Sequence, residues 1–197
     1  MTMNIREQRS QKTKETIIEV AIDLIESASF DIVTINQICN KANVTKGAFY
    51  HHFDSKSDIV AEYYKIRVLD NIDIERSEYN STNTVELIEE ITYKLLMLIH
   101  DQGLEFAKQI YKHQLEKPLK YYIVEGEKTT DFLVSLIQEG QSNREIRDDI
   151  DCTTIANLLM KFSRGLIYDW CINEGSYVFS EVAKKDFSIF IESLKYE

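Results

Sequence analysis

Apolar residues recur with helical spacing from residue 17 onward. They fall at positions i, i+1, i+4, i+7 and i+8, which is one face of a helix with 3.6 residues per turn. The residues of this face are Ile17, Ile18, Ala21, Leu24 and Ile25. The pattern predicts an amphipathic helix that begins at Thr13 and ends before the polar break at residues 27–31. Within the break, Phe30 is predicted to pack back as an anchor.

A second and a third helix follow at short distance. Thr34 stands where an N-cap hydroxyl can accept from a free backbone N–H, and the apolar positions after it are Ile35, Ile38, Cys39 and Ala42. Asn43 tolerates left-handed backbone and predicts a tight turn, after which Thr45 can cap a short helix through residue 53. Two short helices on a three-residue turn are a helix-turn-helix, whose second helix fits a DNA major groove about 12 Å wide.

The rest of the chain also has helical spacing. Ser55 can cap a long fourth helix through Leu69 toward Tyr79. Further helices are predicted over Val85–Ile99, Phe106–Tyr111, Leu119–Ile137, Ile155–Trp170 and Val182–Leu194. Asp151 is the expected N-cap of the helix before residue 170, and this capping role is favoured over a metal role for Asp148, Asp149 and Asp151. The chain is therefore predicted to be all-α, with about nine helices.

The charge is distributed unevenly along the chain. The net charge is −10, yet residues 1–56 hold seven basic and seven acidic side chains, so the acidity belongs to the remainder. An acidic body would point a neutral head at DNA, although an acidic surface also serves solubility alone. No stretch is apolar for the roughly 18 residues that a membrane span needs, so no membrane partner and a cytoplasmic location are expected.

Two smaller features carry expectations of their own. The residues before Lys12 are polar, with Arg6 and Arg9 among them, and predict a flexible arm. This arm is either a plain disordered terminus or a segment that reaches the minor groove or phosphates of DNA. Cys39, Cys152 and Cys171 form no CxxC pair and are interpreted as small hydrophobic residues.

One segment carries a family resemblance. Residues 34–59, TINQICNKANVTKGAFYHHFDSKSDI, contain an A-x-V turn followed by the pattern [ST]-x-G-x-[FL]-Y-x-[HY]-F, with a lysine three residues on. From Thr13 to Tyr63 the chain resembles the DNA-binding head of the TetR/AcrR family, apart from Ser29 and Asn43, where glycine is usual. The resemblance implies a helix-turn-helix head over residues 1–56. It also implies a ligand-binding and dimerisation bundle over residues 57–197.

Physical reasoning and this resemblance agree on the DNA contacts. Thr45 and Lys46 point outward from the first turn of the recognition helix, where they can reach base edges or phosphates, and Gly47 leaves room for the groove. Tyr50 suits a phosphate oxygen, and His51 suits a phosphate or a thymine methyl group. His52 is either a contact or a buried histidine. The N-termini of the second and fourth helices predict phosphate contacts at Thr34 and Lys56.

The second part of the chain resembles the family more loosely. A ligand pocket is expected near Tyr64, Tyr93, Met97, His100, Phe106, Tyr111, Tyr122, Phe132 and Tyr168, although any one of these can instead be core. A homodimer interface is expected from Ile155, Leu158, Leu159, Phe162, Gly165, Leu166, Trp170, Val182, Phe187, Phe190 and Leu194.

These observations favour one function. We expect a repressor that binds a palindromic double-stranded operator as a homodimer and is released by a small-molecule inducer. A small-molecule or partner-binding protein with a vestigial head is the alternative. An enzyme is not expected, because the sequence shows no nucleophile with a base at motif spacing and no glycine-rich phosphate loop. No metal site and no cofactor are predicted either.

Overall fold

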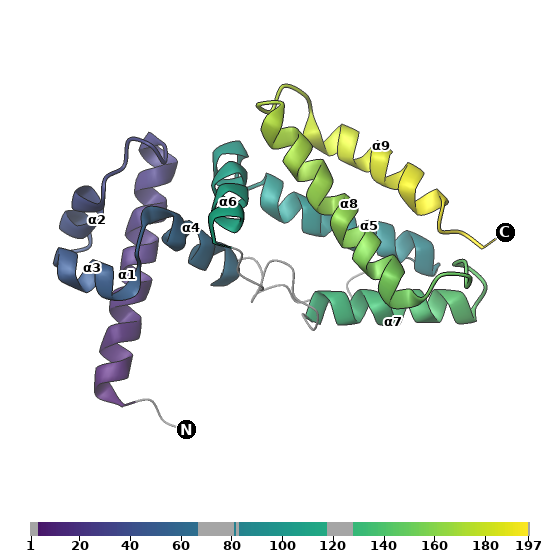
Figure 1. The fold of residues 1–197 in the computed structure, drawn as a ribbon, viewed down its shortest axis with the longest axis horizontal. Coiled ribbons are helices and arrows are strands. Elements are labelled where there is room, and N and C mark those ends of the chain that lie inside the picture. The colour runs from purple at the N-terminus through teal and green to yellow at the C-terminus, as the bar shows by residue number, and fades with distance from the viewer. Residues whose placement is uncertain (1–3, 67–80, 82, 118–127, 197) are drawn as a thin grey trace. The chain divides into compact units, whose positions relative to one another are not determined.

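The computed structural model describes residues 4–66, 81, 83–117 and 128–196. In these residues the chain forms nine helices and one isolated β-bridge, between Ile146 and Lys195 (Figure 1). The predicted all-α class is therefore confirmed. The chain divides into two compact units, Met1–Asn71 and Ile72–Glu197. None of the described helices is long and apolar enough to cross a membrane.

Four helices build the N-terminal unit. They are α1 (Ile5–Ala28), α2 (Ile35–Lys41), α3 (Lys46–His52) and α4 (Lys56–Tyr64). Both α2 and α4 pack on α1, and α3 packs on α2. Their shared core contains Ile17, Ile18, Ala21, Ile22, Val33, Ile38, Cys39, Phe49, Phe53 and Ile59. Phe30 is buried, as predicted for an anchor.

The start of α1 corrects one prediction. A flexible arm was expected before Lys12, but the structure is helical from Ile5 onward. The Asn4 side chain accepts from the Glu7 N–H, and the Glu7 carboxylate accepts from the Asn4 N–H, both at 2.9 Å. This capping box satisfies two of the backbone donors that a helix start leaves open. The expectation was wrong because it rested on the low apolar content of these residues alone.

The fourth helix belongs with the head. It packs along α1, and Glu62 accepts from the Lys14 ammonium at 2.5 Å. The compact unit accordingly runs to Asn71, whereas the sequence placed the boundary at residue 56. The predicted extension of this helix toward Tyr79 lies outside the described residues.

Five helices build the second unit. They are α5 (Thr84–His100), α6 (Leu104–Glu116), α7 (Lys128–Ser142), α8 (Cys152–Ile172) and α9 (Phe179–Glu192). α5 contacts each of the other four, and α7 and α6 also pack on α8. The predicted helix over residues 119–137 is observed from Lys128 and continues to Ser142, while residues 118–127 lie outside the described part. α6 is longer than predicted at both ends.

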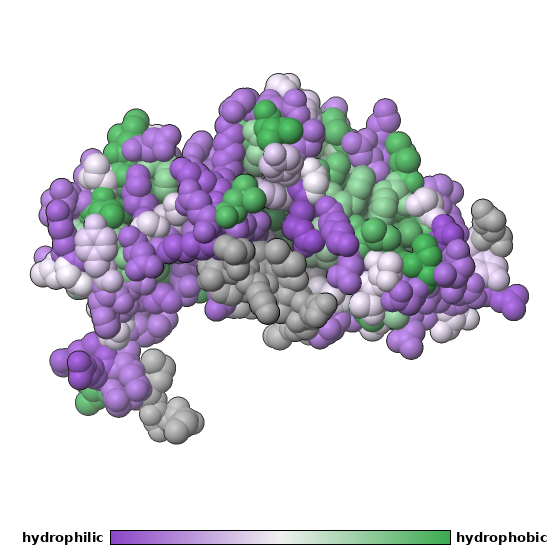
Figure 2. Space-filling model, viewed as in Figure 1, coloured by the Kyte–Doolittle hydropathy of each residue, from purple (hydrophilic) through white to green (hydrophobic). Residues whose placement is uncertain are grey.

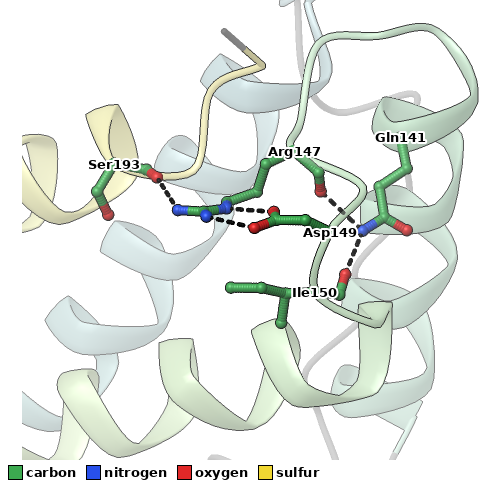
Figure 3. Close-up of polar contacts among 5 residues, drawn as sticks. All are labelled: Gln141, Arg147, Asp149, Ile150 and Ser193. Carbon is green, nitrogen blue, oxygen red and sulfur yellow. Dashed lines mark hydrogen bonds and ion pairs between the residues drawn. The ribbon is translucent and has the colours of Figure 1, made fainter.

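The loop from α7 to α8 is tied to the end of the chain (Figure 3). The Arg147 guanidinium donates to both Asp149 carboxylate oxygens at 2.6 Å and to the Ser193 carbonyl at 3.4 Å. Gln141 donates to the carbonyls of Arg147 and Ile150 across the loop. The hydrogen bonds from Arg147 hold the pKa of Asp149 below its ordinary value. The loop therefore presents α8 in a fixed position.

Asp151 is the N-cap of α8, as predicted. Its carboxylate accepts from the Thr154 N–H at 2.9 Å and from the Thr154 hydroxyl at 2.6 Å. These hydrogen bonds lower the pKa of Asp151 from its ordinary value. Within the described ranges, no group of three or more His, Cys, Asp and Glu side chains is arranged to hold a metal ion.

Candidate nucleic-acid interface

The turn between α2 and α3 has defined hydrogen bonds. Asn43 has a φ of 54°, in the left-handed region. The Val44 N–H donates to the Cys39 carbonyl at 3.0 Å, and the Asn43 N–H donates to the Asn40 carbonyl at 3.3 Å. These two bonds are the Schellman pattern, which satisfies the last carbonyls of a helix. The turn therefore ends α2 and sets the direction in which α3 leaves.

Threonine side chains cap both helices of the motif. The Thr34 hydroxyl accepts from the Gln37 N–H at 3.2 Å and donates to the Gln37 side-chain oxygen at 2.8 Å. The Thr45 hydroxyl accepts from the Ala48 N–H at 3.1 Å. Both predicted N-caps are confirmed. Because its hydroxyl already makes these two bonds, Thr34 acts first as a structural cap.

Recognition helix α3 has one buried and one exposed side. Phe49 and Phe53 are buried at 0% and 4% exposure, and they fix the helix against the core of the unit. Lys46, Gly47, Tyr50 and His51 are exposed on its other positions. The Tyr50 ring is 54% exposed and meets Phe49 edge-on at 5.4 Å between centroids. The structure thus brings most of the predicted DNA contacts together on one exposed surface.

Gly47 has no structural reason to be glycine inside the unit. A Cβ built there meets only the Thr45 hydroxyl oxygen, at 3.8 Å, and its backbone is not left-handed. Glycine inside a helix costs about 0.5–1 kcal/mol relative to alanine. Glycine therefore leaves open space beside the backbone of α3 at this position.

Two histidines end the recognition helix. The His51 and His52 rings lie 5.0 Å apart, between centroids, at an interplanar angle of 71°. His51 is exposed, whereas His52 is half-buried. Burial, and then the positive charges of His51 and Lys14, lower the pKa of His52. His51 therefore faces outward as predicted, while His52 also contributes to packing beside Phe53.

Lys56 has a role that the sequence did not reveal. Its ammonium donates to the carbonyls of Phe30 and Val33 at 2.6 and 2.5 Å, and lies 4.4 Å from the centroid of the Phe30 ring. These carbonyls belong to the connection between α1 and α2. The Lys56 ammonium thus anchors this connection, and the phosphate contact expected at Lys56 stays a prediction.

Comparison with known proteins agrees with this geometry. Residues 17–63 match the family model described as bacterial regulatory proteins, tetR family. Residues 17–63 therefore carry a DNA-binding domain of the TetR-family type. It is 24% identical over 186 residues to the HTH-type transcriptional repressor KstR2 of Rhodococcus jostii, covering 90% of this chain and 89% of KstR2. It is 34% identical over 59 residues to the regulator AcrR of Shigella flexneri, covering 30% of this chain and 27% of AcrR. These relatives are named as regulators.

Solved structures have the same fold as this chain. A complex of SmeT with triclosan superposes with a TM-score of 0.63 at 15% identity, covering 94% of this chain and 93% of SmeT. GusR of Salmonella enterica superposes with a TM-score of 0.57 at 18% identity, covering 92% of this chain and 96% of GusR. At these identities, the likeness establishes the fold alone.

The predicted pocket residues do not form one site within the described part of the chain. Met97, Tyr111 and Phe132 pack at the edge of the second unit's core. Tyr93 lines a groove of about 350 Å³ with three glutamates of α5 and with Lys184 and Phe187 of α9. The remaining predicted residues are placed separately: Tyr64 is buried and belongs to the N-terminal unit, Phe106 is half-buried, and Tyr122 lies outside the described residues.

Three of the predicted aromatic residues nevertheless have close partners in the second unit. His100 stacks on Phe179 at 5.3 Å and lies 5.1 Å from the ring of Trp170. Tyr111 donates to the Arg164 carbonyl at 2.6 Å, and its ring lies 5.9 Å from that of Tyr168. These contacts join α5 and α6 to α8 and α9, so the aromatic residues connect four helices of the unit.

The predicted dimer residues divide into core and surface. Five of them are buried inside the subunit: Ile155, Leu159, Trp170, Phe187 and Leu194. Phe162, Leu166, Val182 and Phe190 are half-buried, and Phe162 stacks on Phe190 at 4.6 Å. Leu158 and Gly165 are exposed. Ile172 and Ile189, which the prediction did not include, are also exposed, because spacing alone does not tell which apolar positions face the subunit's own core.

Proposed function

We propose that this protein is a homodimeric transcriptional repressor that places α3 of each subunit in the major groove of an operator. The observation that carries the proposal is the exposed surface of α3 beside its buried phenylalanines. Lys46, Gly47, Tyr50 and His51 lie on this surface, and Lys46 forms no ion pair among the described residues. One side of this helix carries a cation, a hydroxyl group and a glycine that lets another backbone come close. These are the groups that recognition of a DNA groove requires.

The exposed apolar row of α8 supports a dimer. Leu158, Gly165 and Ile172 are spaced by seven residues, and all three are exposed. A Cβ at Gly165 would meet nothing within 4 Å, so a second helix has room to approach there. Figure 2 shows hydrophobic side chains gathered over α8 and α9. A seven-residue apolar repeat is the pattern with which helices pair across a bundle.

An experiment on oligomeric state tests this interface. Leu158→Asp with Ile172→Asp should convert the dimer to a monomer in light scattering after size-exclusion chromatography. Leu115→Asp is the matched control, because Leu115 is 81% exposed on α6 and outside the proposed row. A wild-type monomer, or a dimer that survives both aspartates, would contradict the α8 row.

Release by a small molecule completes the proposal. The solved SmeT complex holds triclosan within the same fold, and the aromatic residues of the second unit offer apolar surface for a ligand. Trp170 is the single tryptophan of the chain and lies beside His100 and Phe179, so its fluorescence reports on this unit. A ligand that shifts the fluorescence of Trp170 and releases DNA over the same concentration range would support the proposed release. A ligand that binds without changing the affinity for DNA would not be an inducer, and the repressor function would stand without it.

The DNA-binding function is tested with a DNA sequence that the protein itself selects. A duplex is selected from a random library with the wild-type protein, and its affinity is compared with that of a scrambled duplex. Lys46→Ala should weaken binding and reduce the preference for the selected sequence, because Lys46 sits in the first turn of α3. Lys41→Ala is the control, because it also removes one positive charge from the head. Lys41 lies on α2 rather than on α3, and its ammonium pairs with the Asp23 carboxylate of α1 at 3.9 Å. A protein that selects no sequence would favour a vestigial head.

A further inference from the structure

The N-terminal turns of α1 extend beyond the core of their unit. Ile17 is the first fully buried residue of α1, and Lys14 before it already pairs with Glu62 of α4, so residues 5–12 precede the packed part of the helix. At about 1.5 Å per residue these positions span roughly 12 Å. Within the N-terminal unit, Figure 1 shows this segment projecting past α2 and α3, and Figure 2 shows it as a hydrophilic protrusion. The segment is therefore a helical arm of the head.

Hydrogen bonds on one row of the arm keep it helical. Asn4 and Glu7 form the capping box, and the Gln11 side chain donates to the Glu15 carboxylate at 2.9 Å. Glu7, Gln11 and Glu15 are spaced by four residues, so they follow one row along the helix. Exposed helices without packing are marginal in water, and such local bonds hold the arm in one direction. The acidic groups of the arm are thus used by the helix itself.

The basic groups of the arm have no such partners. Arg6, Arg9 and Lys12 are spaced by three residues, which places their side chains on a common side of the helix. All three are exposed, and none forms a side-chain hydrogen bond or an ion pair within the described residues. In contrast, Lys14 and Lys56 of the same unit are bound to Glu62 and to two carbonyls. The available positive charge of the described head therefore lies on the arm and at Lys46.

We propose that residues 5–12 of α1 form a basic arm that binds DNA phosphates flanking the groove segment occupied by α3. This inference rests on the proposed DNA-binding function and adds a second contact to it. The occupant is the DNA backbone, because exposed cations on a rigid helix complement a regular row of phosphates and the rest of the protein is acidic. An acidic segment of another protein is the competing occupant of the arm. If the arm bound such a segment instead, the affinity for DNA would not depend on the length of the duplex.

The test compares two duplexes and three proteins. The short duplex carries only the selected operator, and the long duplex adds about ten base pairs, one helical turn, on each side. The arm variant carries Arg6→Gln, Arg9→Gln and Lys12→Gln, since glutamine keeps a high helix propensity. The matched control carries Lys112→Gln, Arg144→Gln and Lys185→Gln, which removes three exposed charges from the second unit. Circular dichroism verifies equal helix content before affinities are measured from 50 to 300 mM salt.

The expected result depends on duplex length. Wild type should bind the long duplex more tightly than the short one, and the arm variant should lose this gain. Each lost phosphate contact lowers the slope of log affinity against log salt by about 0.9, so one contact per arm in a dimer lowers it by about two units. The control should retain the wild-type slope.

Three other outcomes overturn the inference. If wild type gains nothing from the flanking base pairs, the arm has no DNA role, although the proposed repressor function stands. If the control loses as much as the arm variant, the effect is one of overall charge and the arm is not a specific contact. If wild type binds neither duplex, the proposed function fails and the arm contact fails with it.

Discussion

The ammonium of Lys56 lies 2.5 Å from the carbonyl oxygen of Val33, on the residue that precedes the cap of α2. Through the same ammonium, α4 also holds the carbonyl of Phe30. The helix-turn-helix is thus anchored at its entrance by a charge from the fourth helix. This contact makes the orientation of α2 depend on α4, although the two helices are separated in sequence by α3.

Removing this anchor should destabilise the head. Lys56→Met keeps the aliphatic stem but leaves two carbonyls without their donor. Hydrogen bonds to charged groups contribute about 1.5–3 kcal/mol, so the free energy of unfolding in urea should fall by about 1–3 kcal/mol. Lys46→Met on exposed α3 is the control and should change stability by less than about 0.5 kcal/mol. Equal stability of the two variants would show that the Lys56 contacts contribute nothing.

Substitution of Gly47 should change the stability of the head and its affinity for DNA in opposite directions. Gly47→Ala places a methyl group in open space within the unit, so the head should gain about 0.5–1 kcal/mol in thermal or urea unfolding. The same methyl group should weaken binding to the selected duplex, because it stands where the groove approaches. Stabilised protein with unchanged affinity would show that α3 does not approach DNA at this position.

The left-handed turn predicts a contrast between two substitutions. Asn43 has a φ of 54°, which glycine adopts without strain and alanine does not. Asn43→Ala should lower the free energy of unfolding of the head by about 1 kcal/mol, whereas Asn43→Gly should be close to neutral. Urea unfolding of both variants measures the difference. A neutral alanine variant would mean that the turn can relax to another conformation.

Acid stability of the second unit should depend on Asp151. Its pKa is lowered in the folded chain by the hydrogen bonds from Thr154, so the stabilisation is present above the ordinary pKa near 3.8. It is lost as pH falls below that value toward the folded pKa. Asp151→Asn retains a capping oxygen without titrating there, so its stability should change less between pH 5 and pH 3 than that of wild type. Thermal unfolding at both pH values gives the comparison, and identical pH profiles would contradict this role.

Local signals in the sequence were sufficient for most of the head. Thr34, Asn43 and Thr45 were predicted in their roles because each acts on backbone groups within five residues. The capping box of Asn4 and Glu7 was equally local, and weighing it against the low apolar content would have extended α1. The anchor at Lys56 could not be predicted, since its carbonyl acceptors are 23 and 26 residues away in sequence.

The second unit was harder to predict for a related reason. Helical spacing identified both Leu158 and Leu159 as apolar positions of α8, yet one is exposed and the other is buried. Which of two adjacent apolar side chains faces the subunit's own core depends on how α5, α7 and α9 surround α8. The same limit applies to the aromatic residues, because a pocket is defined by several helices at once.

A gel shift tests whether α3 recognises an operator. Purified protein is titrated onto the DNA immediately upstream of its own gene at two salt concentrations, with excess random DNA as competitor. We expect a complex that survives the competitor, weakens steeply with salt and is lost in Lys46→Ala. A wild-type protein with no preference for this DNA or for any selected duplex, at either salt concentration, would mean that α3 does not recognise an operator.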